Sequence, residues 1–265
     1  GESHPKLLGK VADCVVALNN LRSFKPQELS NIAWAYSTAE ESHPKLFEKV
    51  ADHTVALNSL RSFEPQDFSN IVWAYSTAGK QHHGLFKKVA DHIVALNNLA
   101  SFKPQNLSNI VWAYSTAGKQ HHGLFKKVAD HIVALNNLAS FKPQELSNMA
   151  WAYATAKDTQ PRLFEKLAVV AVKKKNEFDS QEIANFLWSC AANGQMDQHL
   201  FSSFVPATKS LINKCNSQDL ANIAWAYAVA DVDAPSLFND GFIRACSKKE
   251  KDFTREALHQ LYQWH

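Results

Sequence analysis

Apolar side chains recur along this chain with helical spacing, in segments that short polar connections separate. One such segment is 44–60, whose apolar residues are Leu46, Phe47, Val50, Val55, Leu57 and Leu60. Intervals close to three or four residues place these side chains on one side of a helix of about four turns. We name this predicted element helix A. No segment of the chain has the alternating pattern of a strand.

A second helix, helix B, is predicted to follow after a short connection. Pro65 suits its first turn, where the missing N–H of proline costs nothing, and Gly79 is placed to end it. The apolar side of helix B contains Phe68, Ile71, Val72 and Tyr75, and the opposite side contains Asn70, Trp73 and Thr77. Helices A and B together form a helical hairpin of about 39 residues.

The same hairpin recurs along the whole chain. Six tryptophans, at positions 34, 73, 112, 151, 188 and 225, are spaced 39, 39, 39, 37 and 37 residues apart. A fixed period in this range indicates an array whose units bury their apolar sides against their neighbours. The sequence therefore predicts an all-α fold, a single α-α superhelical solenoid over 1–265, with repeats at 5–39, 44–78, 83–117, 122–156, 161–193 and 199–230 and a partial unit at 235–265.

Composition and motifs argue against several classes of function. No apolar run reaches 18 residues, so we expect no membrane-spanning segment. The four cysteines, Cys14, Cys190, Cys215 and Cys246, form no C-x-x-C pair, which favours a reducing compartment over a disulfide framework or a zinc site. The net charge of +3 is compatible with a polyanionic partner.

The sequence contains none of the usual catalytic motifs. It has no nucleophile paired with a base, no glycine-rich phosphate loop and no paired carboxylates. Two adjacent histidine pairs, at 82–83 and 121–122, have no cysteine or carboxylate beside them to complete a metal site, and we interpret them as connection residues. We therefore expect no enzymatic activity, metal or cofactor.

The start of helix B carries a family resemblance. The residues Phe24, Pro26, Gln27, Leu29, Ser30, Asn31, Trp34, Ala35 and Tyr36, in this order, resemble the octotricopeptide repeat and the related heptatricopeptide repeat found beside RAP domains and in FAST-kinase-like proteins. Six copies of the Asn-x-x-Trp spacing cover almost the whole chain. The segment 253–265 resembles the helix that precedes a RAP domain in such proteins.

This resemblance implies selective binding of single-stranded RNA in mitochondria or chloroplasts, during RNA maturation, stabilisation, translation or ribosome assembly. No transit peptide is visible at Gly1, which says nothing about targeting. The last two full repeats depart from the pattern, because Ser180 and Ser217 replace the proline and Trp188-Ser189-Cys190 replaces Trp-Ala-Tyr. Base reading is therefore less expected in those units.

Two other functions fit an α-solenoid. The array can act as a protein–protein scaffold that holds a peptide or helix on its surface, or as a stoichiometric part of a ribosome. RNA binding predicts a steep dependence of affinity on salt concentration, because phosphate neutralisation releases counterions. A protein scaffold does not have this dependence.

Four columns of polar residues occupy equivalent places in the repeats and are the candidates for RNA contact. The second residue of helix B is always glutamine: Gln27, Gln66, Gln105, Gln144, Gln181 and Gln218. The third varies: Glu28, Asp67, Asn106, Glu145, Glu182 and Asp219. The sixth is always asparagine: Asn31, Asn70, Asn109, Asn148, Asn185 and Asn222. Helix A contributes the lysines Lys10, Lys49, Lys88, Lys127 and Lys166.

The third residue of helix B is the candidate for base selectivity, because it varies while staying polar. Carboxylate and amide groups discriminate base edges by their donor and acceptor pattern. Capping of the helix start explains the same column equally well, since acidic residues are favoured at this position. Both explanations remain open at this point.

The lysines of helix A would place one positive charge on each repeat. Packed helices are about 8–10 Å apart, whereas stacked nucleotides rise only about 3.4 Å, so RNA that followed these lysines would have unstacked bases. Aspartates three residues further along, at positions 13, 52, 91 and 130, favour an ordinary solvated surface just as well.

The uniform tryptophans and asparagines have a structural and a functional interpretation. We interpret the tryptophans as wedges that fill space between stacked repeats, with a base-stacking series as the alternative. Asparagine has poor helix propensity, so a specific contact must retain it in mid-helix. A bond to a neighbouring backbone is favoured for this column, and contact with nucleotides is the alternative.

Overall fold

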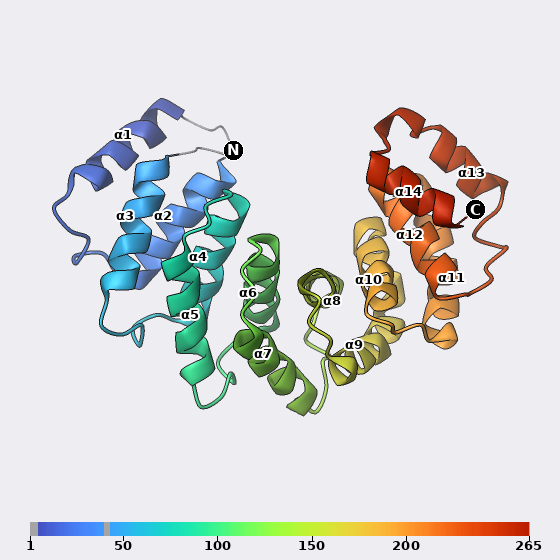
Figure 1. Cartoon of the computed structure of the whole chain (residues 1–265), viewed down its shortest axis with the longest axis horizontal. Coiled ribbons are helices and arrows are strands. Elements are labelled where there is room, and N and C mark those ends of the chain that lie inside the picture. The colour runs from blue at the N-terminus through green and yellow to red at the C-terminus, as the bar shows by residue number, and fades with distance from the viewer. Residues whose placement is uncertain (1–4, 40–42, 265) are drawn as a thin grey trace. The chain divides into compact units, whose positions relative to one another are not determined.

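The computed structural model describes residues 5–39 and 43–264, and within them it contains helices and no strands (Figure 1). The A helices are α1 (Pro5–Ala17), α3 (Pro44–Ala56), α5 (His83–Ala95), α7 (His122–Ala134), α9 (Pro161–Lys174), α11 (Gln198–Leu211) and α13 (Asp240–Ser247). The B helices are α2 (Pro26–Thr38), α4 (Pro65–Thr77), α6 (Pro104–Thr116), α8 (Pro143–Ala156), α10 (Ser180–Ala192), α12 (Ser217–Val229) and α14 (Arg255–Trp264). Short 3-10 turns follow α9, α11 and α13, at 175–177, 212–214 and 250–252.

The predicted helical hairpin is confirmed, with one change of length. Helix A was expected to reach residue 60, but α3 ends at Ala56 and Leu57 is extended, with φ −63° and ψ 135°. Asn58 and Ser59 follow, and both residue types favour turns over helix interiors. Helix B ends as predicted, because Gly79 has a φ of 65° and supplies the left-handed conformation that glycine adopts without strain.

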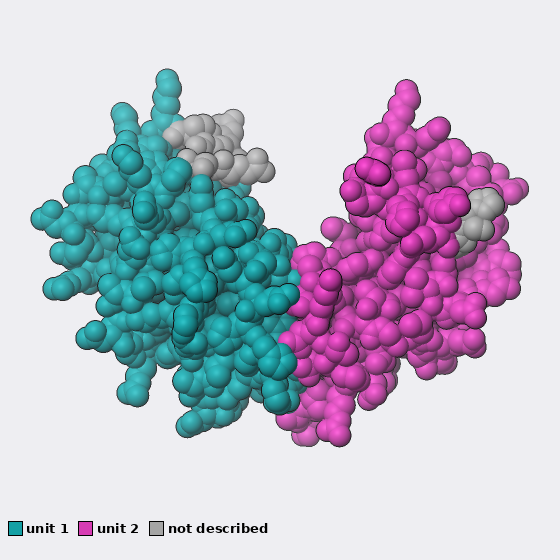
Figure 2. All heavy atoms as spheres, viewed as in Figure 1, with its two compact units in different colours: residues 1–131 teal, residues 132–265 magenta. Residues whose placement is uncertain are grey.

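The chain forms two compact units, residues 1–131 and residues 132–265 (Figure 2). In the first unit, α2, α4 and α6 pack side by side, and α1, α3 and α5 form a second layer (Figure 1). In the second unit, α8, α10, α12 and α14 pack in succession, with α9 and α11 beside them. Each unit therefore has the layered α-solenoid packing that the repeat predicts; one continuous array over 1–265 stays a prediction.

The last described helix extends the B layer of the second unit. α14 packs against α12, and the Ser217 hydroxyl donates to the Asp252 carbonyl just before it, at 2.9 Å. The helix that was expected to precede a RAP domain is thus also the B helix of a seventh hairpin, whose A helix is α13. His265, the last residue of that predicted segment, lies outside the described residues.

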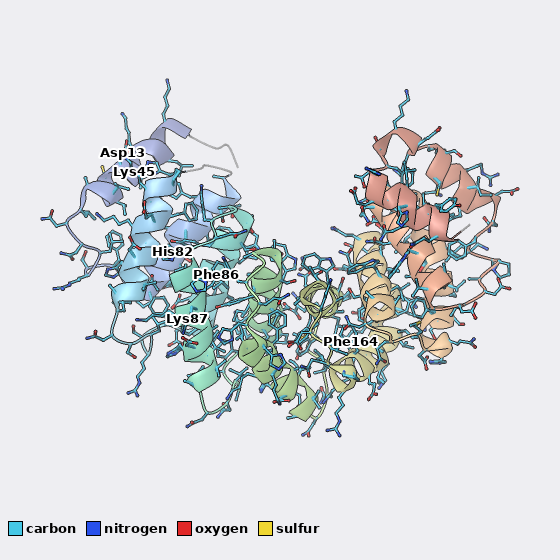
Figure 3. The ribbon with its side chains drawn as sticks, in the orientation of Figure 1. Asp13, Lys45, His82, Phe86, Lys87 and Phe164 are labelled. Atoms are coloured by element: carbon cyan, nitrogen blue, oxygen red, sulfur yellow. The ribbon has the colours of Figure 1, made fainter. Side chains whose placement is uncertain are left out.

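Leucine and aromatic side chains fill the space between the two layers. Phe86 of α5 and Phe164 of α9 are fully buried (Figure 3), as are the leucines next to them. A tyrosine of helix B joins the two layers in several hairpins: the Tyr114 hydroxyl donates to the Phe86 carbonyl at 2.5 Å, and the Tyr227 hydroxyl donates to the Phe201 carbonyl at 2.9 Å. Burial of these tyrosines fixes helix B against its own helix A.

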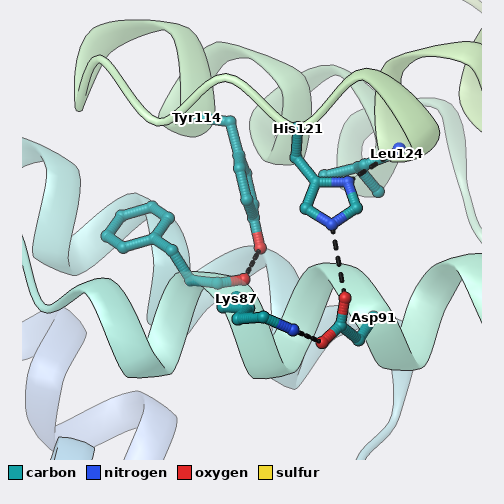
Figure 4. A network of polar contacts seen from close by, with 6 residues as sticks. Lys87, Asp91, Tyr114, His121 and Leu124 are labelled. Carbon is teal, nitrogen blue, oxygen red and sulfur yellow. Dashed lines mark hydrogen bonds and ion pairs between the residues drawn. The ribbon is translucent and has the colours of Figure 1, made fainter.

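Histidines at the start of the A helices join successive repeats of the first unit. In His82 and His121, Nδ1 accepts from the backbone N–H three residues on, at 3.1 Å in both, and thereby caps α5 and α7. The Nε2 atom of His82 lies 3.2 Å from Asp52 of the preceding A helix, and the Nε2 atom of His121 lies 3.3 Å from Asp91 (Figure 4). These two residues therefore have a specific capping role that their interpretation as connection residues did not include.

Other groups at this surface have ordinary structural partners. Lys87 pairs with Asp91 at 2.5 Å (Figure 4), and this hydrogen bond lowers the pKa of Asp91.

Among the described residues, no three histidine, cysteine, aspartate or glutamate side chains are grouped to hold a metal ion. No helix in the described part of the chain has both the length and the apolar character needed to cross a membrane.

The lysines of the helix A column cap the C-terminal end of the preceding A helix. Lys88 Nζ donates to the carbonyls of Val55, at 2.7 Å, and Leu57, and Lys127 Nζ donates to Leu96 at 2.6 Å. The same pattern holds for the other two members with a preceding helix, Lys49 and Lys166. A cation at a helix C-terminus satisfies carbonyls that lack a partner and complements the helix dipole. RNA contact by this column, including the exposed Lys10, stays a prediction.

Replacing Lys88 by methionine is expected to lower the free energy of unfolding by about 1–2 kcal/mol, because two charge-assisted hydrogen bonds to backbone carbonyls are lost. Lys87→Met is the matched control. Its exposed ion pair with Asp91 contributes roughly 0–0.5 kcal/mol. Urea unfolding followed by circular dichroism compares the two variants, and equal midpoints would contradict the capping role.

Candidate nucleic-acid interface

The second, sixth and ninth residues of each B helix lie on one side of the helix, because they are four and three positions apart. In the first six B helices these residues are glutamine, asparagine and tryptophan. All six glutamines are exposed, whereas the asparagines range from exposed Asn31 to buried Asn222. We name this surface the amide–indole face. Each of the two units has its own part of it.

The tryptophans of this face contact one another but are not buried. Trp34 is 45% exposed, and the other five are half-buried. Ring centroids are 6.5 Å apart for Trp34 and Trp73, and 6.1 Å apart for Trp188 and Trp225, with tilts of 34° and 37°. The interpretation as wedges is therefore incomplete, because the indoles of these two pairs pack on each other across repeats and still present ring surface to solvent.

The spacing of the indoles limits how a base can use them. A base inserted between two rings needs about 6.8 Å, twice the stacking distance of about 3.4 Å, and the observed separations are smaller. A base must therefore lie on the solvent side of the rings. The separation of 6.1–6.5 Å between the ring centroids of these two pairs is nearly twice the rise of about 3.4 Å in a stacked strand, so a strand whose bases followed the rings would have its bases unstacked.

In the second unit the amides of this face bond to each other. The Gln218 amide donates to Asn222 Oδ1 at 2.8 Å, and Gln260 of α14 donates to the same oxygen at 3.3 Å. Asn222 in turn donates to Asn185 at 3.5 Å. Asn185 and Asn222 are thus joined by their side chains across successive B helices, whereas the sequence favoured a bond to neighbouring backbone. For the other four asparagines that bond stays a prediction.

Two residues of this face, Gln260 and Gln263, were not predicted from the sequence. They occupy the sixth and ninth positions of α14, and Trp225 Nε1 donates to Gln263 Oε1 at 2.7 Å. Neither residue matches the Asn-x-x-Trp letters. The signal that could have found them is the distance of 38 residues from Asn222 and from Trp225, which continues the period.

The third residue of helix B caps the helix start in all six repeats. Its side-chain oxygen accepts from the backbone N–H of the residue before the helix, at 2.8–3.0 Å. Asp67 and Asn106 also reach the preceding repeat, where Ser30 Oγ lies 3.3 Å from Asp67 and Ser69 Oγ lies 3.2 Å from Asn106. Four members of the column are buried: Asp67, Asn106, Glu145 and Asp219.

This geometry supports the capping explanation for the column that was the candidate for selectivity. An aspartate, glutamate or amide oxygen can accept the same N–H, so the variation needs no base-reading role. Burial raises the pKa values of Asp219 and Glu182, which matches side chains that face the protein. Base contact by this column stays a prediction, and a weaker one than the sequence alone indicated.

Asp67→Ala is expected to lower the free energy of unfolding by about 1–2 kcal/mol, because the cap and the contact with Ser30 are both lost. Asp67→Asn is the matched control and should remain within about 0.5 kcal/mol of the wild type, since Asn106 performs the same role one repeat later. Thermal unfolding measures both. A loss equal to that of alanine in the asparagine variant would contradict the assignment.

Each unit has a pocket on the amide–indole face. A pocket of about 330 Å³ lies between α2 and α4, and Gln27, Asn31, Gln66 and Asn70 line it together with Lys25 and Glu64. A pocket of about 870 Å³ in the second unit is lined by Trp188, Trp225, Gln218, Gln260 and Gln263, with Arg255 and His259 beside them. Both pockets join hydrogen-bonding groups to a polar or aromatic rim, which suits a planar polar ligand.

Comparison with protein families matches residues 4–255 to the RNA-editing substrate-binding complex 6 protein. The match covers nearly the whole chain and includes the B helices α2 to α12 that carry the amide–indole face. Comparison with curated proteins finds no match.

Proposed function

We propose that this chain, which belongs to the RNA-editing substrate-binding complex 6 protein family, binds single-stranded RNA on the amide–indole face of its B helices. The observation that supports this proposal is the repetition of one indole and two amides per helix, on positions that are exposed or half-buried except for Asn222. Indoles stack on any base, and alanine substitution of such aromatic residues costs about 1–3 kcal/mol per base. Amides supply donors and acceptors to base edges.

The proposed ligand is an extended strand with one nucleotide for each repeat, about six or seven nucleotides in total if every hairpin contributes. The separation of 6.1–6.5 Å between successive indoles supports this arrangement, because a strand with stacked bases would rise only about 3.4 Å for each nucleotide. The lysine column and the third residues of the B helices are secondary in this proposal, since their polar groups, apart from that of Lys10, already bond the protein.

The family name describes a protein of an RNA-editing substrate-binding complex, so we propose that this chain acts within an assembly of proteins and RNA. Its finer relation to octotricopeptide or heptatricopeptide repeats belongs to the same proposal. RNA-editing complexes of kinetoplastids are mitochondrial, and of the two organelles that the resemblance allows we propose the mitochondrion. We propose a binding role without catalysis.

The test is binding of a randomised single-stranded RNA pool, measured by filter retention at 50 and 200 mM salt. The proposal predicts an affinity that falls steeply with salt, with a slope that tracks the phosphates neutralised, about −0.7 for each in single strands. An identical pool annealed to its complement is the control and should bind more weakly. Undetectable or salt-independent binding would refute the proposal and favour a protein scaffold, and co-purification with ribosomal particles would favour a ribosomal role.

A further inference from the structure

The uniform residues of the amide–indole face cannot by themselves distinguish one base from another along the chain. Glutamine, asparagine and tryptophan are the same in six B helices, and the varying third residues cap the helices. A selective position must be exposed, must differ between repeats and must lie at the same pocket. The residue just before helix B is exposed and varies between repeats, and its first two members line the pocket between α2 and α4. This column is Lys25, Glu64, Lys103, Lys142, Asp179 and Asn216.

The pocket between α2 and α4 brings two members of this column to the amide–indole face. Lys25 and Glu64 line that pocket with the glutamines Gln27 and Gln66 and the asparagines of the same helices. A nucleotide held by the amides would therefore lie within reach of an ammonium group on one side and a carboxylate on the other. Both side chains are exposed, so neither must be moved from the core to make contact.

The first four members have side chains that the helix does not use. In the described part of the chain, Lys25, Lys103 and Lys142 make no side-chain capping hydrogen bond, because an ammonium group has no acceptor to offer a helix N–H. Glu64 also makes no side-chain capping hydrogen bond there, although its carboxylate lies in a capping box with Asp67 at the start of α4. The two members that precede a serine-initiated helix differ. Asp179 and Asn216 each accept from a helix N–H at 2.8 Å, so their oxygens have a structural partner.

We propose that residues 25, 64, 103 and 142 select the base held by their repeats. This inference rests on the proposed RNA binding and names the base classes. Lysine only donates hydrogen bonds, so it favours bases with an acceptor edge, guanine or uracil. The Glu64 carboxylate only accepts, so it favours an amino group, as in cytosine or adenine. The second repeat thus prefers the opposite class from the first and third.

Glu64→Lys tests this assignment. The fold accepts lysine here, because three other repeats have lysine at the equivalent position. Glu48→Lys is the matched control, because it makes the same change of charge at a residue that is exposed on α3 and does not line the pocket. Each protein is incubated with a randomised single-stranded RNA pool, and the bound sequences are enriched and read.

Glu64→Lys is expected to change one position of the enriched motif from cytosine or adenine to guanine or uracil, by roughly tenfold in relative preference. Glu48→Lys should leave the motif unchanged and raise the affinity for all sequences alike. If Glu64→Lys and Glu48→Lys enrich the same motif as the wild type, the inference is overturned and RNA binding itself stands. If the wild type binds no RNA, the proposed function fails and the inference fails with it.

Discussion

Replacing Gln27, Gln66 and Gln105 together by glutamate is expected to lower the affinity for single-stranded RNA by roughly a hundredfold or more. Each change keeps the shape of the side chain and adds one negative charge to the exposed amide–indole face of the first unit. At close approach to a phosphate, a unit charge costs about 1 kcal/mol in water and more in a partly desolvated site. Three such charges sum to about 3 kcal/mol, and about 1.4 kcal/mol corresponds to a tenfold change.

The same triple variant should fold as well as the wild type. The glutamines are the second residues of their helices, where a carboxylate meets the positive end of the helix dipole and adds about 0.3–1 kcal/mol of stability. Reduced binding with an unchanged or raised unfolding temperature would separate function from folding. Filter binding and thermal unfolding are measured on the same preparation.

The matched control replaces Asn19, Asn58 and Asn97 by aspartate. These residues are exposed and equivalent in the first three repeats, and the change adds the same three charges at the ends of the A helices. The control should lose only the small affinity that follows from net charge, about threefold in 150 mM salt, where exposed charges are screened over about 8 Å. Equal losses in the two variants would show that the amide–indole face is not the contact surface.

Much of the fold follows from local sequence, because each hairpin is set by contacts within about 39 residues. The sequence shows these features directly: a proline at the start of helix B, a glycine after it and an apolar side on each helix. The lysine column was harder to interpret, because the partners of Lys88 are backbone carbonyls 31 and 33 residues earlier. A backbone acceptor leaves no trace in the pattern of side chains.

The candidate site was less predictable than the fold for the same reason. The exposed fraction of Trp34 depends on how closely the next B helix approaches, and periodicity does not fix that distance. Gln260 and Gln263 belong to the face although their letters differ from those of earlier repeats. The glutamines, in contrast, were identified from their constancy and position, and the structure places all six on the surface.

Replacing Trp34 and Trp73 together by leucine is expected to lower RNA affinity by at least thirtyfold. Each indole that stacks on a base contributes about 1–3 kcal/mol, and leucine keeps an apolar side chain for packing while removing the aromatic surface. Replacement of both residues by phenylalanine should retain most of the binding, because a smaller aromatic ring still stacks. Fluorescence anisotropy of a labelled RNA measures the affinities, and circular dichroism verifies the fold.

The comparison of the leucine and phenylalanine variants distinguishes two roles of the indoles, packing between repeats and contact with a base. The ring centroids of Trp34 and Trp73 lie 6.5 Å apart across two repeats, so loss of the rings must weaken packing to some degree. If packing were the whole role, both variants would lose stability and a folded leucine variant would bind RNA like the wild type. If the exposed surface of Trp34 holds a base, the leucine variant binds RNA more weakly even where its unfolding midpoint equals that of the phenylalanine variant. The missing ring then lowers the affinity for RNA without lowering the stability of the fold.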